Sequence, residues 1–265
     1  MVSVKDIYKY MDQIAPFALQ MGFDNAGFLV GRGAQKVERL MVSLDITEDV
    51  VAEAVKKNCQ LIVAHHPVIF QPAKAITDDT VTGRVLLALT ENRIAAICAH
   101  TNLDAVRAGV NDCLAAALEL RDVEQLSQDG LDPEGNPYGI GRVGVAHKPG
   151  LSASEYAAFV KEKLGTASVR FVDAGKPIKK VAVGGGSCGS MVAEALALGC
   201  DAFVTADVKH DQYLSAKAQG LALMDAGHFA TENVVCAPLA LRLAQQFPAV
   251  EALLSESYRE AYSGL

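Results

Sequence analysis

Histidine and carboxylate residues follow three predicted strands of this chain, and their types could hold metal ions. The five residues are His65 and His66, Asp104, and His228 with Glu232. Neutral imidazoles combined with carboxylates suit Zn, Fe, Mn, Co or Ni better than Ca or Mg. A carboxylate can bridge two ions roughly 3.5–4 Å apart, and such a pair lowers the pKa of a bound water. The five residues therefore form a candidate site for two divalent metal ions.

The position of these residues after strands matters because open α/β sheets bind ligands outside the carboxyl ends of their strands. Residues far apart in the sequence can then converge on one crevice. His228 and Glu232 are four residues apart and would face the same way on a helix. Taken singly, each piece has an ordinary interpretation: His65-His66-Pro67 as a loop and Asp104 as a helix N-cap. The combination favours a metal site.

Strands and helices alternate along the first half of the chain. Residues 3–20 have the apolar spacing of an amphipathic helix. The segment ERLMVSLDIT (38–47) predicts a strand, after which Thr47 would cap a helix that runs to about residue 58. Two short apolar strands follow, QLIVA (60–64) and IAAICA (94–99), separated by a helix near residues 80–92. This alternation predicts a mostly parallel sheet covered by helices on both faces.

The same pattern resumes after residues 127–139, which are dense in Asp, Gly and Pro and mark the best boundary in the chain. The sequence predicts a helix near 152–164 with Ser152 or Ser154 as its cap, and final helices at 232–246 and 249–261. We therefore predict an α/β protein with two similar α/β/α lobes and mostly parallel sheets. The metal site would lie in the crevice at the carboxyl ends of the strands.

Three regions follow from these elements. Residues 1–126 would form a first α/β lobe with metal ligands, and residues 127–220 a second α/β lobe. Residues 221–265 would form a C-terminal segment that returns metal ligands to the first lobe. The chain has 265 residues, which is enough for one large domain or two ordinary ones.

The segment GGGSCG (184–189) fits the pattern G-x-G-x-x-G between a predicted strand and a helix. Such a loop can bind phosphates through backbone N–H groups, and Asp207 ends the next strand as a dinucleotide site would require. Three interpretations remain: a dinucleotide site, a contact to phosphate or substrate, or glycines that permit tight packing of strand and helix.

Other polar residues could support the metal site. His100 could hold a ligand side chain in place or move protons. Asp24 and Asn25 lie in a glycine-flanked turn, where Asx residues also serve simply as turn formers. For Asp45 we favour a helix-capping role beside Thr47. The segment TADVKHD (205–211) could contact the phosphates or base of a ligand.

Composition limits the other classes of function. The net charge is −7 with no basic run, which argues against nucleic-acid binding. No apolar stretch reaches about 18 residues, so no membrane-spanning helix is expected. The N-terminal segment carries charges throughout and does not resemble a signal peptide. None of the six cysteines forms a C-x-x-C pair, which is typical of reduced, buried cysteines in a cytoplasmic protein.

Several separated motifs, in order, resemble those of the Nif-three-like proteins, also called the GTP cyclohydrolase I type 2-like family. The chain is similar to the short form of this family, which lacks an inserted middle domain. It differs from the usual family pattern at Phe23, where Trp is common, and at Ala26 and Phe28. The motifs that carry the resemblance are DNAGFLVG (24–31), SLDIT (43–47), AHHPVIF (64–70), HTNLDA (100–105), GVND (109–112) and GHFATE (227–232).

The resemblance implies a dinuclear metal site built from the same five residues, with Glu232 touching both ions. It also implies a toroidal homohexamer and a small-molecule substrate. The expected activity is that of a metal-dependent hydrolase acting on a nucleotide-like molecule, with GTP suggested by the family label and His100 as the proton-moving residue. The alternative is a metal-binding assembly or regulatory protein without turnover. A third hypothesis is a dinucleotide-dependent enzyme that uses the segment 184–189.

Overall fold

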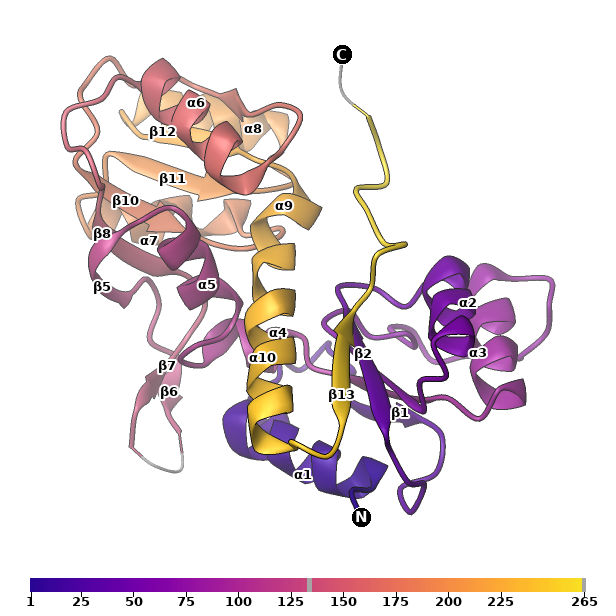
Figure 1. The fold of residues 1–265 in the computed structure, drawn as a ribbon. Helices are drawn as coiled ribbons and strands as arrows, with labels where there is room; N and C mark the ends of the chain where they lie inside the picture. Colours follow the sequence, from indigo (N-terminus) through magenta and orange to yellow (C-terminus); the bar gives the residue numbers. More distant parts are fainter. Residues whose placement is uncertain (133–134, 264–265) are drawn as a thin grey trace. The chain divides into compact units, whose positions relative to one another are not determined.

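The computed structural model describes residues 1–132 and 135–263, so residues 133 and 134 of the predicted boundary stretch lie outside the described residues. The chain divides into two compact units (Figure 1). Unit 1 comprises Met1–Leu103 and Cys236–Arg259, and unit 2 comprises Asp104–Val235 and Glu260–Leu265. The chain thus passes between units after residues 103, 235 and 259, and not at the boundaries 126/127 and 220/221 that the sequence suggested.

Unit 1 contains a five-stranded sheet in the order β1-β4-β3-β2-β13. Strands β2, β3, β4 and β13 run parallel, and β1 pairs with β4 antiparallel. Every residue of β3 and β4 is buried, as expected for parallel strands with both faces covered. The strands are β1 (Gly27–Val30), β2 (Arg39–Ser43), β3 (Leu61–Ala64), β4 (Ala95–Cys98) and β13 (Glu251–Leu254).

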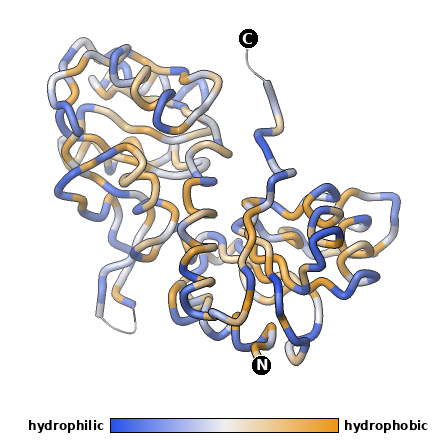
Figure 2. The backbone as a smooth tube through the Cα atoms, viewed as in Figure 1, coloured by the Kyte–Doolittle hydropathy of each residue, from blue (hydrophilic) through white to orange (hydrophobic). Residues whose placement is uncertain are grey.

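Helices α2 (Glu48–Lys56) and α3 (Val81–Glu91) pack their apolar residues against this sheet. The cluster between them includes Met41, Ile62 and Ala96 from three neighbouring strands. Figure 2 shows hydrophobic residues concentrated along the strands of each unit. Helix α10 (Cys236–Gln246) packs on β2 and β13. These layers hold the carboxyl ends of β2, β3 and β4 side by side.

The first helix is shorter than predicted. Helix α1 (Val4–Ile14) begins at a capping box between Ser3 and Asp6, and a short 3-10 turn (Phe17–Leu19) follows it. Pro16 explains the early end, because proline disfavours the helical conformation in the residue before it.

The predicted final helix at 249–261 is wrong. Residues 251–254 form β13, which pairs in parallel with β2 along the edge of the sheet (Figure 1). An unpaired sheet edge leaves backbone N–H and C=O groups without partners, and β13 satisfies those of β2. The segment Glu251–Leu254 contains good helix formers, so pairing within the fold overrides its local preference.

Unit 2 contains a six-stranded sheet in the order β5-β8-β10-β11-β12-β9. The central strands β10, β11 and β12 run parallel, and β8, β5 and β9 add antiparallel pairs. The predicted α/β class is confirmed, but the mostly parallel arrangement holds only for unit 1, because the sheet of unit 2 is mixed. The strands are β5 (Arg121–Gln125), β8 (Arg142–Val145), β9 (Arg170–Phe171), β10 (Lys180–Val183), β11 (Ala202–Thr205) and β12 (Ala222–Asp225).

The helices of unit 2 include α6, which matches the prediction for residues 152–164 and has Ser152 as its cap. Helix α4 contains the boundary between the units, which falls between Leu103 and Asp104. Strands β6 (Gly130–Leu131) and β7 (Pro137–Tyr138) form a separate pair. No helix among the described residues is long and apolar enough to cross a membrane. The helices are α4 (Thr101–Ala105), α5 (Val110–Ala117), α6 (Ala153–Leu164), α7 (Val192–Ala197), α8 (His210–Ala218) and α9 (His228–Glu232).

Candidate metal centre

His65 and His66 lie directly after β3, at the carboxyl edge of the sheet in unit 1. The backbone N–H of His66 donates to the carbonyl of Leu44 at 2.9 Å, and that of His65 donates to the same carbonyl at 3.1 Å. These bonds hold the strand end beside the segment that follows β2. The two imidazole rings lie 5.0 Å apart, so consecutive residues present both rings on one side of the strand end.

Each histidine in this region holds its Nδ1 atom against an acceptor. His65 Nδ1 donates to the carbonyl oxygen of Ala99 at 2.8 Å, and His66 Nδ1 lies 2.9 Å from the Asp45 carboxylate. His100 Nδ1 lies 2.8 Å from the carboxylate of Asp24. An acceptor at Nδ1 favours the tautomer with its lone pair on Nε2 and fixes the plane of the ring. This arrangement is typical of metal-binding histidines.

His65, His66 and His100 gather into one group, which we call the histidine cluster. The ring of His100 lies 5.1 Å from that of His65 and 5.5 Å from that of His66. One ring nitrogen from each residue lies within 4.8 Å of the others, so the cluster could hold a metal ion within unit 1 alone. His100, which the sequence suggested as a supporting residue, therefore stands among the possible ligands.

Asp24 fixes His100 and the start of α4. Its carboxylate accepts hydrogen bonds from His100 and from the backbone N–H and hydroxyl of Thr101, at 2.8, 3.0 and 2.5 Å. Burial raises the pKa of Asp24, but the hydrogen bonds from His100 and Thr101 outweigh it and lower the pKa to about 2. Asp24 is therefore an anion that orients His100, and not only a turn former.

Asp45 has a different role from the one we predicted. The cap of α2 is Thr47, whose hydroxyl accepts from the N–H of Val50. The Asp45 carboxylate instead accepts from His66 Nδ1 and from the hydroxyl of Tyr258. Burial raises its pKa, but the bonds from His66 and Tyr258 lower it below the usual range. The signal that could have revealed this role is the position of Asp45 just after β2, the neighbour of the strand β3 that His66 follows.

In unit 2, helix α9 places His228 and Glu232 on one face, as their four-residue spacing predicted. Nε2 of His228 lies 2.9 Å from the Glu232 carboxylate. The other nitrogen of His228, Nδ1, lies 2.7 Å from the carboxylate of Asp207. The sequence suggested that the segment around Asp207 contacts a ligand, whereas here Asp207 orients His228. His228 thus shares the arrangement of the histidines in unit 1.

The glycine-rich loop (184–189) packs against this helix. The N–H of Gly185 donates to the side chain of Asn111 at 2.9 Å, and that of Gly186 donates to the hydroxyl of Thr231 at 3.1 Å. Gly186 has a φ of +62°, and a Cβ atom there would lie 2.0 Å from Oε1 of Glu232. These N–H groups are engaged within unit 2, so the geometry favours the packing interpretation over a phosphate or dinucleotide site.

Asp104 is the first residue of unit 2 and connects to the same loop through Asn111. The buried side chain of Asn111 donates to the backbone carbonyl of Asp104 at 3.0 Å while accepting from Gly185. Burial raises the pKa of Cys188, and the nearby charges of Asp104 and Glu232 raise it further. Both carboxylates therefore lie near Cys188. Unit 2 thus gathers all three of its candidate ligands around the glycine-rich loop.

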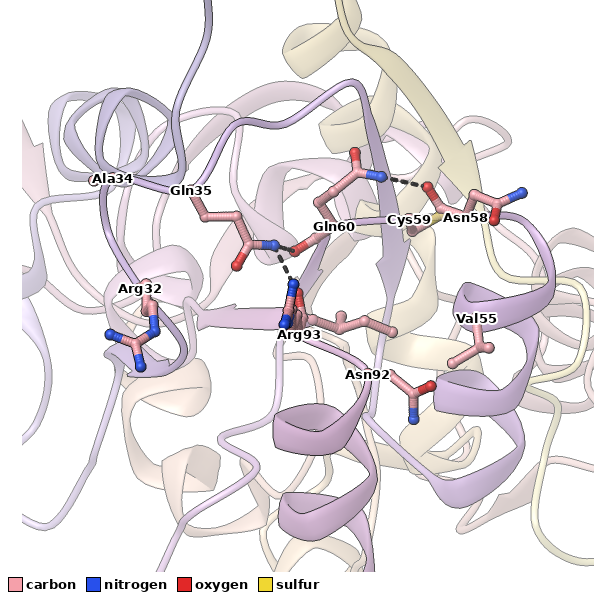
Figure 3. Close-up of a pocket in the computed structure, with 10 residues that line it drawn as sticks. Arg32, Ala34, Gln35, Val55, Asn58, Cys59, Gln60, Asn92 and Arg93 are labelled. Carbon is pink, nitrogen blue, oxygen red and sulfur yellow. Dashed lines mark hydrogen bonds between the residues drawn. The ribbon is translucent and has the colours of Figure 1, made fainter.

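An open hollow of about 660 Å³ lies elsewhere in unit 1 (Figure 3). Its lining mixes apolar residues such as Val55 and Ile94 with polar ones such as Arg32 and Arg93. Nε2 of Gln35 donates there to the carbonyls of Gln60 and Arg93 at 3.1 and 2.6 Å. The hollow lies where β3 and β4 begin, whereas the histidine cluster follows the ends of these strands. It is therefore separate from the candidate metal ligands.

Comparison with known proteins places this chain among relatives. The family model described as Duf34/NIF3 (NGG1p interacting factor 3) matches residues 2–260. The chain belongs to the DUF34/NIF3 family. A family relative from Clostridium perfringens, named GTP cyclohydrolase 1 type 2 homolog, is 32% identical over 98% of this chain and 99% of its own length. One of the same name from Streptomyces coelicolor is 38% identical over 89% and 84%.

Solved structures of other proteins share the fold. A Staphylococcus aureus hypothetical protein superposes with a TM-score of 0.92 at 27% identity, covering 99% of each chain. A Bacillus cereus protein related to NIF3 superposes with a TM-score of 0.93, covering 100% of this chain and 99% of its own. Its sequence identity is 23%, so this second likeness concerns the fold alone. The family resemblance and the α/β fold predicted from the sequence are both confirmed.

Proposed function

We propose that this DUF34/NIF3 protein binds two divalent metal ions through His65, His66, Asp104, His228 and Glu232. The supporting observation is that the three histidines of this set each hold Nδ1 against an acceptor oxygen. That arrangement leaves Nε2 as the ligand atom and fixes each ring before a metal arrives. The ligand chemistry suits Zn, Fe, Mn, Co or Ni.

Two of the proposed ligands of unit 2 lie close in the sequence to points where the chain passes between the units. The chain passes from unit 1 to unit 2 between Leu103 and Asp104, so Asp104 is itself the first residue after the crossing. It returns to unit 1 after Val235, three residues beyond Glu232. Two of the three ligands from unit 2 therefore lie within a helical turn of a crossing. In the proposed site, the carboxylate of Glu232 would help to hold the ions.

The proposed reaction is hydrolysis of a nucleotide-like small molecule. A bound pair of divalent ions would lower the pKa of a water molecule and so supply a nucleophile at neutral pH. His100 would accept and return protons at Nε2, because Asp24 orients its ring through Nδ1. Asp45 and Asp207 would hold the rings of His66 and His228 in place.

GTP is the proposed substrate, because curated relatives carry the name GTP cyclohydrolase 1 type 2 homolog. Water would attack the carbon between the two imidazole nitrogens of guanine and open that ring. A second hydrolysis would release formate. The name of these relatives is the reason for choosing GTP as the substrate, and His100 supplies the proton-transfer group.

The decisive experiment is the metal content per chain, measured by plasma mass spectrometry on protein purified without added metal. We expect about two ions per chain, with strong loss in His65→Ala and Glu232→Ala. His147→Ala is the matched control, because this exposed histidine pairs with Glu119 away from the candidate ligands. No metal in the native protein, and none taken up from Zn, Mn or Fe solutions, would refute the site.

Turnover of GTP is then measured with the metal found. Metal-dependent release of formate would support the proposed reaction. A stable two-ion protein that hydrolyses no nucleotide would favour the metal-binding assembly or regulatory role instead. We also propose a homohexamer in the cytoplasm, and light scattering of the purified protein tests the oligomeric state, which a stable monomer would contradict.

A further inference from the structure

Two large aromatic side chains lie exposed beside the histidine cluster. Phe23 is 63% exposed and Phe70 is 43% exposed, and their ring centroids lie 6.4 Å apart at an interplanar angle of 67°. The ring of Phe70 also lies 6.1 Å from that of His100, at 86°. Single exposed apolar residues are common on protein surfaces. A pair in contact with a cluster of possible metal ligands is a more specific feature.

The backbone that carries this aromatic pair is held by hydrogen bonds on both sides. Asn25 Nδ2 donates to the carbonyl of Ile69 at 2.5 Å, which joins the residue two after Phe23 to the residue before Phe70. Asp24, directly after Phe23, is bound to His100 and Thr101. The two rings are therefore positioned relative to His100, although water covers much of their surface.

Such positioning is useful for binding and not for stability. An exposed ring contributes little to the core, because the hydrophobic effect depends on apolar area removed from water. A ring fixed in advance loses little conformational entropy when a ligand covers it. Aromatic faces stack well on planar heterocycles, and edge-to-face aromatic pairs leave a face available for this.

We propose that Phe23 and Phe70 form the part of the substrate site that stacks on a planar heteroaromatic ring and brings it against His100. This inference rests on the proposed function and deepens it, because it names the part of the substrate that the protein recognises. Neither ring carries charge, and the ionised group nearest to them along the chain is the Asp24 anion. The pair therefore selects for a neutral ring system and does not bind phosphate.

The test compares the binding of two kinds of probe by calorimetry. The planar probes are guanosine, adenosine and uridine triphosphates, and inorganic tripolyphosphate is the probe without a ring. We expect Phe23→Ala and Phe70→Ala to weaken at least one nucleotide by about 5- to 100-fold and to leave tripolyphosphate unchanged. Phe70→Trp should retain nucleotide binding. Phe171→Ala, which removes a ring that is 39% exposed in unit 2, is the matched control and should change neither probe.

Metal content and solution mass are measured on the same samples. Equal nucleotide affinity in the wild type, Phe23→Ala and Phe70→Ala would overturn the proposal, and so would failure of the wild type to bind any of the three nucleotides. A changed oligomeric mass in the alanine variants would overturn it as well, because the rings would then serve contact with a second copy of the chain. In each of these cases, a measured content of two ions per chain would still support the proposed metal site.

Discussion

Gly186 offers a direct test of how unit 2 positions the proposed ligand Glu232. A Cβ atom at Gly186 would lie 2.0 Å from Oε1 of Glu232 and 3.2 Å from Cε1 of His228. Carbon and oxygen do not approach so closely without a bond, so Gly186→Ala must displace the carboxylate. We therefore expect the variant to lose most of its bound metal while keeping its fold.

The expected loss of folding stability in Gly186→Ala has two contributions. Alanine in a left-handed conformation costs roughly 1–2 kcal/mol. Overpacking against a buried side chain adds about 1–3 kcal/mol. Gly165 separates the two, because it has the same φ of +62° and a Cβ atom there would meet no other atom within 4 Å. Gly165→Ala should therefore show the backbone cost alone and retain the full metal content.

The assay is urea unfolding together with metal content for the two variants and for Gly186→Ala combined with Glu232→Ala. If the carboxylate causes the clash, the extra destabilisation of Gly186→Ala over Gly165→Ala should largely disappear in the double variant, since contacting residues are not additive. If the Gly186→Ala variant still contained two ions per chain, the reasoning would be refuted. Glu232 would then either bind metal from a displaced position or not be a metal ligand.

Three other outcomes are expected. Asp45→Asn should lower metal affinity by roughly 10- to 100-fold in a chelator competition, because His66 loses its anionic partner. Burial raises the pKa of Glu53, but hydrogen bonds from Lys57 and the segment 255–257 outweigh burial and lower the pKa. The ionised Glu53 therefore stabilises the folded state above pH ~4.3, and this contribution to the free energy of unfolding is lost as the pH falls. Glu53→Gln should reduce the stability to urea at pH 7 and make the stability fall less steeply in acid. Calorimetry should detect no binding of NAD at the loop 184–189, because its N–H groups donate within unit 2.

The sequence predicted an element correctly where the interactions that define it lie within the same segment. The apolar run 61–64 has the length of a buried strand, and Pro67 follows soon after, so His65 and His66 could be placed at a strand end. Helix α6 could be bounded because Ser152 and Glu155 form a capping box that is visible in the sequence. In both cases the deciding interactions lie within a few residues.

The prediction of structure or residue role failed where a partner far away in the sequence determines it. Strand β13 exists because β2 has an open edge, and these two strands are about 210 residues apart in the sequence. Asp45 and His66 meet because β2 and β3 are neighbours in the sheet. The loop 184–189 matches a phosphate-binding pattern by spacing alone, whereas Asn111 and Thr231 take its N–H groups. Neither partner lies near the loop in the sequence.

The acceptors behind the four histidines differ in charge. His65 donates Nδ1–H to a neutral carbonyl, whereas His66, His100 and His228 each face a carboxylate. A carboxylate behind an imidazole makes Nε2 more basic and stabilises positive charge on the ring, while a carbonyl mainly sets its orientation. An acceptor therefore fixes the ring in all four cases, and a carboxylate acceptor is also found behind His66 and His228, which are proposed metal ligands. His100 differs from these in its contact with Phe70, whose ring centroid lies 6.1 Å from its own. We therefore assign proton transfer to His100, which lies beside the proposed ring-binding pair, and metal binding to His65, His66 and His228.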